Sequence, residues 1–300
     1  MKIAVTGAFS YSGKYITRRL LERGEEVITL TGHPDRPDPF GGRVKAFPLD
    51  FSDEKGLAGH LQGTEVLVNT YWVRFDRGTN TQARAVENTR RLVQAAKSAG
   101  VRRIVHISIA NPSADSPLPY YRGKAANEQT VIDSGPSYAI LRPTLIFGRE
   151  DILLNNIAWL LRRFPFFAQI GDGRYRVQPV CVDDLAEIAS RSVYEPKNLI
   201  QDVVGPDIFT FDELVRLIGE GIGHPRPILH VSPSLALAAS HLLSLFVGDV
   251  MLTADEVKGL TAGLLVSAET PPGKTRLADW LEANREHVGT RYASEIDRHY

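Results

Sequence analysis

Two glycines near the start of the chain, Gly7 and Gly13, constrain the fold more than any other feature of the sequence. The apolar residues 3–5 lead into Gly7, and Gly13 opens an amphipathic segment that continues beyond Leu20. Glycine at the first position allows a sharp turn out of a strand, because it tolerates positive φ. Glycine at the second position lets a helix pack closely on a sheet. The pattern therefore predicts the strand, turn and helix that open a βαβ unit.

The turn between these glycines predicts a phosphate-binding site. Free backbone N–H groups at a helix N-terminus bind the pyrophosphate of a dinucleotide. Ser10 stands where a middle glycine is usual, so it narrows the allowed backbone conformations while offering a hydroxyl. An ordinary tight turn without a ligand is the alternative interpretation. The candidate residues are Gly7, Phe9, Ser10, Tyr11, Ser12 and Gly13.

Composition and charge narrow the class of protein. The 300 residues carry a formal net charge of +0, which gives no support for nucleic-acid binding. One cysteine, Cys181, excludes an intrachain disulfide and fits a reducing compartment. The first strand begins directly after Met1 and leaves no room for a targeting peptide, so we expect a cytoplasmic protein.

The most apolar late stretch, residues 235–247, is shorter than the roughly 20 residues that span a bilayer. It predicts a buried helix and no membrane span. A surface helix that contacts a membrane or another protein is the alternative. Peripheral membrane contact and oligomerisation therefore stay open.

Short apolar strands and amphipathic helices alternate over the first 150 residues. Such alternation predicts an α/β fold with a doubly wound parallel sheet, the Rossmann architecture. We expect strands at 2–6, 26–31, 43–48, 65–70, 102–108 and 137–142, and helices at 13–23, 52–61, 79–99 and 119–133.

After Pro143 the pattern changes to mostly helical segments, at 151–163, 183–194, 211–220 and 277–283. We therefore expect a dinucleotide-binding domain over 1–150, with segments near 174–205 returning to it. Residues 151–300 then form a smaller, mostly helical lobe on the substrate side. The paired acids Asp183 and Asp184 are interpreted as stabilising a helix N-terminus.

Tyr120 and Lys124 form the spacing Y-x-x-x-K on a predicted helix, which places both side chains on one face. A lysine ammonium beside a phenol favours the phenolate and lowers its pKa. Such a phenol exchanges a proton with a carbonyl or alcohol while a nicotinamide exchanges hydride. The pair follows the fifth strand, so it is expected near the carboxyl ends of the strands, where ligands bind in this fold. A surface Tyr–Lys pair is the alternative.

With these motifs the chain resembles the short-chain dehydrogenase/reductase superfamily, in its extended or atypical branch. It is similar to NAD(P)H-binding proteins related to the nucleotide-binding accessory subunit of respiratory complex I. The resemblance rests on Gly7 and Gly13, Asn69 to Trp72, Asn88, Ser108, Tyr120 and Lys124, 141–148, 149–159, 171–173 and 182–186.

The resemblance implies roles for individual residues. Ser108 would orient the carbonyl, Tyr120 would act as acid and base, and Lys124 would activate Tyr120 and bind the cofactor ribose. Ala110 departs from the family, because it stands where some members place the serine. The further cofactor contacts implied are Asp50 and Phe51, at the adenine, together with Asn69, Thr70, Tyr71, Pro143, Thr144 and Leu145. A helix-capping carboxylate is the alternative role for Asp50.

The end of the second predicted strand favours NADP(H), with NAD(H) as the alternative. NAD-specific Rossmann proteins usually carry an acid there to bind the ribose 2′-hydroxyl. Here Thr31 is followed by His33 and Arg36, which suit a 2′-phosphate instead. A solvated loop charge is the alternative role for Arg36.

The leading hypothesis is an NADP(H)-dependent oxidoreductase that acts on a small-molecule carbonyl or alcohol. Many aromatic residues near strand ends suggest an apolar substrate. A nucleotide-sugar epimerase or dehydratase with recycled NAD and a non-catalytic NAD(P)H-binding subunit or sensor are the alternatives. No histidine, cysteine or acid spacing predicts a metal site.

Overall fold

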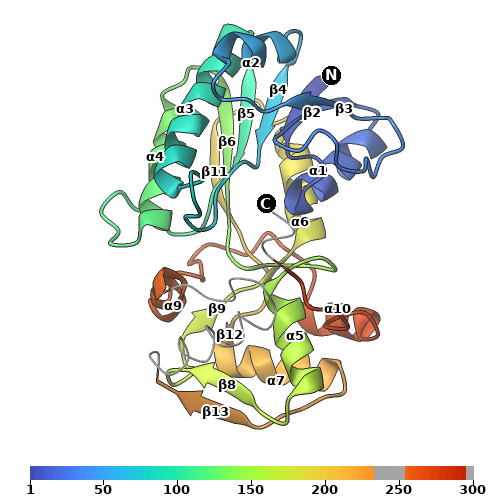
Figure 1. Ribbon diagram of the computed structural model, residues 1–300, viewed down its shortest axis with the longest axis vertical. Helices are drawn as coiled ribbons and strands as arrows, with labels where there is room; N and C mark the ends of the chain where they lie inside the picture. The colour runs from blue at the N-terminus through green and yellow to red at the C-terminus, as the bar shows by residue number, and fades with distance from the viewer. Residues whose placement is uncertain (233–253, 295–300) are drawn as a thin grey trace. The chain divides into compact units, whose positions relative to one another are not determined.

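The computed structural model describes residues 1–232 and 254–294 (Figure 1). The helix expected at 235–247 lies outside the described residues. The chain forms two compact units, Met1–Pro143 with Val182–Val203, and Thr144–Cys181 with Val204–Tyr300. The chain thus leaves the first unit at Pro143 rather than near residue 150, and the segment that returns to it is 182–203.

The first unit is built on a seven-stranded parallel sheet in the order β11-β6-β5-β4-β1-β2-β3. The five central strands are mostly buried and rich in Val, Ile and Leu, as expected for strands covered on both faces, whereas the edge strands β3 and β11 are partly exposed. This arrangement confirms the doubly wound α/β fold. The strands are β1 (Lys2–Thr6), β2 (Glu26–Thr31), β3 (Lys45–Pro48), β4 (Val66–Asn69), β5 (Arg103–Ile107), β6 (Ser137–Pro143) and β11 (Leu199–Val203).

Helices lie on both faces of this sheet, with α3 and α4 on one side and α1 and α6 on the other (Figure 1). The strand order reverses beside β1, so β1 and β4 carry the topological switch point where ligands bind in open α/β sheets. The helices are α1 (Tyr11–Glu22), α2 (Glu54–His60), α3 (Gln82–Ser98), α4 (Pro119–Ile132) and α6 (Val182–Ser192). Asp53 caps α2 and Thr81 caps α3, each one or two residues beyond the expected start.

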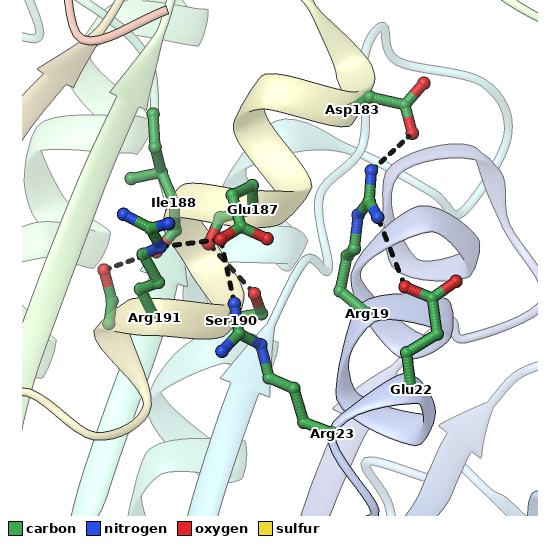
Figure 2. Close-up of polar contacts among 9 residues, drawn as sticks. Arg19, Glu22, Arg23, Asp183, Glu187, Ile188, Ser190 and Arg191 are labelled. Atoms are coloured by element: carbon green, nitrogen blue, oxygen red, sulfur yellow. Dashed lines mark hydrogen bonds and ion pairs between the residues drawn. The ribbon is translucent and has the colours of Figure 1, made fainter.

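Ion pairs join α6 to α1 across the surface of the first unit (Figure 2). Arg23 Nη2 lies 2.8 Å from Glu187 Oε1, and Arg19 Nη2 lies 3.5 Å from Asp183 Oδ1. Asp183 and Asp184 fall in the first turn of α6, where acids favour the helix dipole. The returning segment is thereby attached to the helix that follows the glycine turn.

In its described residues, the second unit combines helices with three two-stranded sheets. Its core includes the buried residues Phe147, Phe211, Leu281 and Cys181. Thr210 and Glu213 form a reciprocal capping box at the start of α7. The elements are β7 (Ile146–Phe147), α5 (Leu153–Arg163), β8 (Phe167–Ile170), β9 (Arg176–Val177), β10 (Val180–Cys181), β12 (Phe209–Thr210), α7 (Phe211–Gly221), β13 (Ile228–Val231), α9 (Ala254–Thr261) and α10 (Leu277–Asn284).

Candidate active site

The glycine turn after β1 has the geometry of a phosphate cradle. Gly7 has φ of +65°, and a Cβ atom placed on Gly13 would lie 2.2 Å from the Gly7 carbonyl oxygen. Only glycine at position 13 therefore lets α1 approach the turn this closely. The first turn of α1 contains no acid, and its N-cap residue makes no side-chain capping bond. The N–H groups at such a helix start fit the pyrophosphate of a dinucleotide.

Ser10 takes the place of the usual middle glycine without strain. Its φ of −91° and ψ of 172° lie in the extended region that any residue adopts. Its N–H donates to the Gly7 carbonyl at 2.8 Å and closes the turn. The turn is therefore formed by serine as well as it would be by glycine.

The other residues of the turn begin α1 or pack beside it. Phe9 lies 6.4 Å from the Phe40 ring on the loop after β2. Tyr11 is the first residue of α1 and meets Tyr15 edge to face, and Ser12 follows in the same turn.

The end of β2 carries hydroxyl, imidazole and guanidinium groups and no acid at its tip. The buried Thr31 accepts a hydrogen bond from the His33 N–H at 3.1 Å. The Arg36 N–H then donates to the His33 carbonyl at 3.2 Å and forms a turn. His33 is exposed and Arg36 is half-buried, so this loop presents both side chains beside the strand end.

Asp50 and Phe51 follow β3. The exposed Asp50 carboxylate accepts hydrogen bonds from the side chain and backbone of Ser52, which lower its pKa. Asp50 therefore stabilises the turn at residues 50–52 through Ser52. The residue that caps α2 is Asp53 and not Asp50. The Phe51 ring lies 4.8 Å from Tyr71.

Asn69 at the end of β4 links three strands from inside the sheet. Its Oδ1 accepts from the Thr6 hydroxyl at 3.2 Å and from the Tyr71 N–H at 3.0 Å. Its Nδ2 lies 3.1 Å from Nδ1 of His106, and both side chains are fully buried. Asn69 therefore fixes the ends of β1, β4 and β5 relative to one another. Thr70 supports the same arrangement, because its hydroxyl donates to the Thr6 carbonyl at 2.6 Å.

Tyr120 and Lys124 lie on one face of α4, as the spacing predicted. Lys124 is only 4% exposed, and its Nζ donates to the Ile107 carbonyl at 3.1 Å, at the carboxyl end of β5. Burial lowers the pKa of Lys124 to about 7, and the Glu128 carboxylate opposes this shift. Burial, with a smaller contribution from Lys124, lowers the pKa of His106 to about 3, so His106 is neutral.

Ser108 contacts the buried carboxylate of Glu128, which forms an ion pair with the half-buried Arg142 and was not predicted from the sequence. Its hydroxyl donates to Glu128 Oε1 at 2.5 Å. The same carboxylate is held by two hydrogen bonds from Arg142, at 3.0 Å and 2.6 Å. The only available sequence signal was the continued spacing Tyr120, Lys124, Glu128 along one helix face. Because the Ser108 proton is used by Glu128, its oxygen is left to accept rather than to donate.

The last three predicted contacts fall at the boundary between the units. Pro143 ends β6, and its carbonyl accepts from the Ala110 N–H at 2.9 Å. Thr144 and Leu145 belong to the second unit. There the Thr144 hydroxyl donates to the Gln178 carbonyl, and the Leu145 carbonyl accepts from Val180 at 2.8 Å.

In the part of the chain that the structure describes, residues 1–232 and 254–294, neither a metal centre nor a membrane-spanning helix is found. No group of three or more His, Cys, Asp or Glu side chains is arranged to hold a metal ion there. No helix there is both long and apolar enough to cross a membrane.

The strand order and the glycine turn define a Rossmann-like α/β protein, and its first unit is similar to NAD(P)H-binding proteins. Residues 7–151 match a family model described as NAD(P)H-binding. The chain is 26% identical over 283 residues to NADH dehydrogenase (ubiquinone) 1 alpha subcomplex subunit 9 of Arabidopsis thaliana, covering 88% of this chain and 70% of that protein. The mouse protein of the same name is 29% identical over 228 residues, covering 71% and 59%.

Solved structures of reductases and epimerases share this fold. Citrobacter triphenylmethane reductase with NADP(H) aligns with a TM-score of 0.76 at 18% identity, covering 95% of this chain and 100% of that chain. The NADPH-dependent quinone oxidoreductase of Escherichia coli aligns at 0.72 and 22%, covering 98% of each. UDP-glucose 4-epimerase from Thermotoga maritima aligns at 0.74 and 16%, covering 96% and 98%. These findings confirm the resemblance inferred from the sequence.

Proposed function

We propose that this protein is an NADP(H)-dependent oxidoreductase that reduces the carbonyl group of an apolar small molecule, or oxidises the corresponding alcohol. The observation that carries the proposal is the placement of Tyr120 and the buried Lys124 on one face of α4, with Lys124 bonded to the end of β5. When bound, the nicotinamide supplies or accepts the hydride. Tyr120 supplies or accepts the proton, and Lys124 favours its phenolate form.

We leave Ser108 out of the proposed chemistry, because its hydroxyl donates to Glu128. The glycine turn is proposed to hold the pyrophosphate through the first N–H groups of α1. Thr31, His33 and Arg36 are proposed to bind the 2′-phosphate of NADP(H), because no acid at the end of β2 competes for that position. Solved structures of this fold hold NADP(H) in some cases and NAD in others, so the proposed preference rests on these three side chains.

Titration of the purified protein with NADPH and NADH, read by nicotinamide fluorescence and thermal shift, tests cofactor binding. A ligand at about 100 times its Kd adds roughly 2.7 kcal/mol of stability. The proposal expects tighter binding of NADPH than of NADH, and an Arg36→Ala variant that loses the preference. Equal binding, or stronger binding of NADH, contradicts the assignment of NADP(H).

Reduction of a carbonyl panel that includes menadione, a quinone, tests the chemistry. Loss of NADPH absorbance reports turnover. Tyr120→Phe is expected to lower kcat by roughly 10²-fold or more, as general acid–base catalysis contributes. Tyr121→Phe is the matched control, because Tyr121 is buried beside it and has no lysine four residues later. Equal rates for the two variants would exclude Tyr120 as the acid and base.

The second candidate function is a non-catalytic NAD(P)H-binding subunit. The relatives named as complex I subunits favour it, and so does the engagement of Ser108 by Glu128. This candidate predicts tight cofactor binding, no turnover with any carbonyl, and no effect of Tyr120→Phe on binding. An epimerase or dehydratase, the third candidate, is supported by the shared fold alone and predicts that NAD(H) co-purifies with the protein.

A further inference from the structure

Trp72, in the loop after β4, contacts both members of the Tyr120 and Lys124 pair. Its indole ring meets the Tyr120 ring edge to face, with centroids 5.5 Å apart and planes at 87°. The Lys124 ammonium lies 4.9 Å from the centroid of the same indole. One aromatic side chain thus lies against the phenol and beneath the ammonium.

Gly123 makes room for this ring on the surface of α4. A Cβ atom at position 123 would lie 2.6 Å from Trp72 Cη2 and 3.3 Å from Val86 Cγ2. Glycine inside a helix is unfavourable, because it loses more backbone entropy than alanine on folding. Gly123 nevertheless lies within α4, between Tyr120 and Lys124. Any side chain at this position would displace the Trp72 indole.

Packing, rather than hydrogen bonding, holds the indole in place. Its Nε1 is buried and has no hydrogen-bond partner. A buried donor without a partner is unfavourable, so the contacts with α4 must outweigh it. A ring held in this way has a fixed position against Tyr120 and Lys124.

The indole face also affects the charge on Lys124. The ammonium is buried, and an aromatic face attracts a cation more strongly when water is excluded. The other groups that bear on Lys124 are the Ile107 carbonyl, which accepts from its Nζ at 3.1 Å, the neutral His106 on β5, and Glu128 on α4, the last paired with Arg142 on β6. The indole therefore adds to the Ile107 carbonyl and Glu128 in favouring the charged lysine.

We propose that Trp72 is a positioning residue, which is seated on Gly123 and holds the Tyr120 phenol and the Lys124 ammonium in their functional geometry. This inference rests on the proposed function, because it gives Trp72 a role in the proton transfer assigned to Tyr120. Trp72 does not itself take part in hydride or proton transfer.

The first test needs neither cofactor nor substrate. The chain has three tryptophans, so Trp159→Phe with Trp280→Phe leaves Trp72 as the sole indole fluorophore. Its emission is expected to titrate with a midpoint near the Lys124 pKa of about 7. The additional variant Lys124→Met is expected to abolish this titration. A curve that stays flat up to about pH 11, past the ordinary lysine pKa of 10.5, or a titration that persists in Lys124→Met, overturns the assigned contact.

The second test measures positioning through NADPH-dependent reduction of menadione. Trp72→Leu and Gly123→Ala are each expected to lower kcat/KM by about tenfold or more, because small misplacements of reacting groups are costly. Both variants should also shift the pH profile, while Trp72→Phe should retain most of the activity because an aromatic face remains. Trp280→Phe, in the other unit, is the matched control and should keep the activity of the original protein.

The two tests separate the possible failures. If the protein binds no NADPH or reduces no carbonyl, the proposed function fails while the fluorescence titration still decides the Trp72–Lys124 contact. If Trp72→Leu stays folded by circular dichroism and keeps both its rate and its pH profile, Trp72 has no positioning role. If Trp72→Leu lowers kcat/KM without shifting the pH profile, Trp72 has only a structural role.

Discussion

The Glu128 carboxylate accepts the Ser108 hydroxyl at 2.5 Å while Arg142 donates two hydrogen bonds to its oxygens. Glu128 is 4% exposed and Arg142 is half-buried, so the carboxylate is removed from water while the guanidinium keeps partial contact with it. Ser108 therefore belongs to a buried network that joins α4 to the ends of β5 and β6. The Ser108 hydroxyl was expected to donate to a substrate carbonyl, but here it donates to Glu128.

Replacing Ser108 tests which of two roles it has. If its hydroxyl only supports Glu128, Ser108→Ala should lower carbonyl turnover by less than about tenfold, well below the roughly 10²-fold expected for Tyr120→Phe. If Ser108 orients the carbonyl, its loss should instead approach the 10²-fold or greater effect of removing a transition-state donor. Steady-state rates with menadione distinguish the two, and Ser116→Ala, on the surface loop before α4, is the control.

Glu128 itself is expected to matter chiefly for stability. Glu128→Ala removes the carboxylate from the partly exposed Arg142 guanidinium, and the loss of such charged hydrogen bonds costs about 1.5–3 kcal/mol. Urea denaturation of the two proteins measures the difference in the free energy of unfolding. Exposed Glu282 in α10 is a suitable control, because Glu282→Ala removes a carboxylate of the same size from solvent. A cost below about 1 kcal/mol for Glu128→Ala would show that the pair is not tightly held.

Gly13 and Gly59 offer a matched pair of glycine substitutions. Gly13→Ala forces a Cβ into the Gly7 carbonyl, so it should destabilise the unit by about 1–3 kcal/mol and weaken NADPH binding. In α2, a Cβ on Gly59 would meet no atom within 4 Å, so Gly59→Ala should stabilise by roughly 0.5–1 kcal/mol. Thermal unfolding and NADPH titration check both, and equal behaviour of the two variants would refute the close approach at Gly13.

The sequence predicted the elements of the first unit closely, because strand and helix periodicity is local. The glycine turn and the Tyr120 and Lys124 face were recognisable for the same reason, since each depends on residues a few positions apart. The partner of Ser108 was not predicted, because Glu128 and Arg142 meet only when α4 packs on β6. Trp72 was predicted only as part of the block Asn69 to Trp72, because its contact with Gly123 joins segments about fifty residues apart. The sequence also did not show whether Ser10 could replace the usual glycine without strain, because that depends on its backbone φ and ψ angles.

The ion pairs between α1 and α6 should contribute little to stability. Although partial burial raises it, hydrogen bonds from Arg191 and Arg23 hold the pKa of Glu187 below its usual value. A lowered carboxyl pKa stabilises the fold above the unfolded pKa and loses that effect as pH falls through the folded value. Because the side chains are about one-third exposed, Glu187→Gln should cost less than about 1 kcal/mol, and the cost should shrink in high salt. A cost above about 2 kcal/mol that salt does not change would contradict this reading.

Lys124 predicts a distinctive dependence of stability on pH. Its pKa is about 7 in the folded chain against an ordinary value of 10.5. Between these values the unfolded chain holds a proton that the folded chain does not, so the free energy of unfolding should rise with pH, by at most about 1.4 kcal/mol per unit. Below pH 7 both states are protonated, and the cost of burying the ammonium is present in full.

Lys124→Met isolates this contribution, because methionine has a similar length and no charge. Urea denaturation from about pH 7 to about pH 9 should show a steeper rise in stability for the original protein than for Lys124→Met. The variant should also be the more stable of the two near pH 7, since it buries no ammonium. Identical slopes would mean that Lys124 keeps its proton in the folded chain, with Trp72 and Glu128 compensating its burial fully. In that case the lysine would be cationic throughout the neutral range, and the pH profile of turnover would report Tyr120 alone.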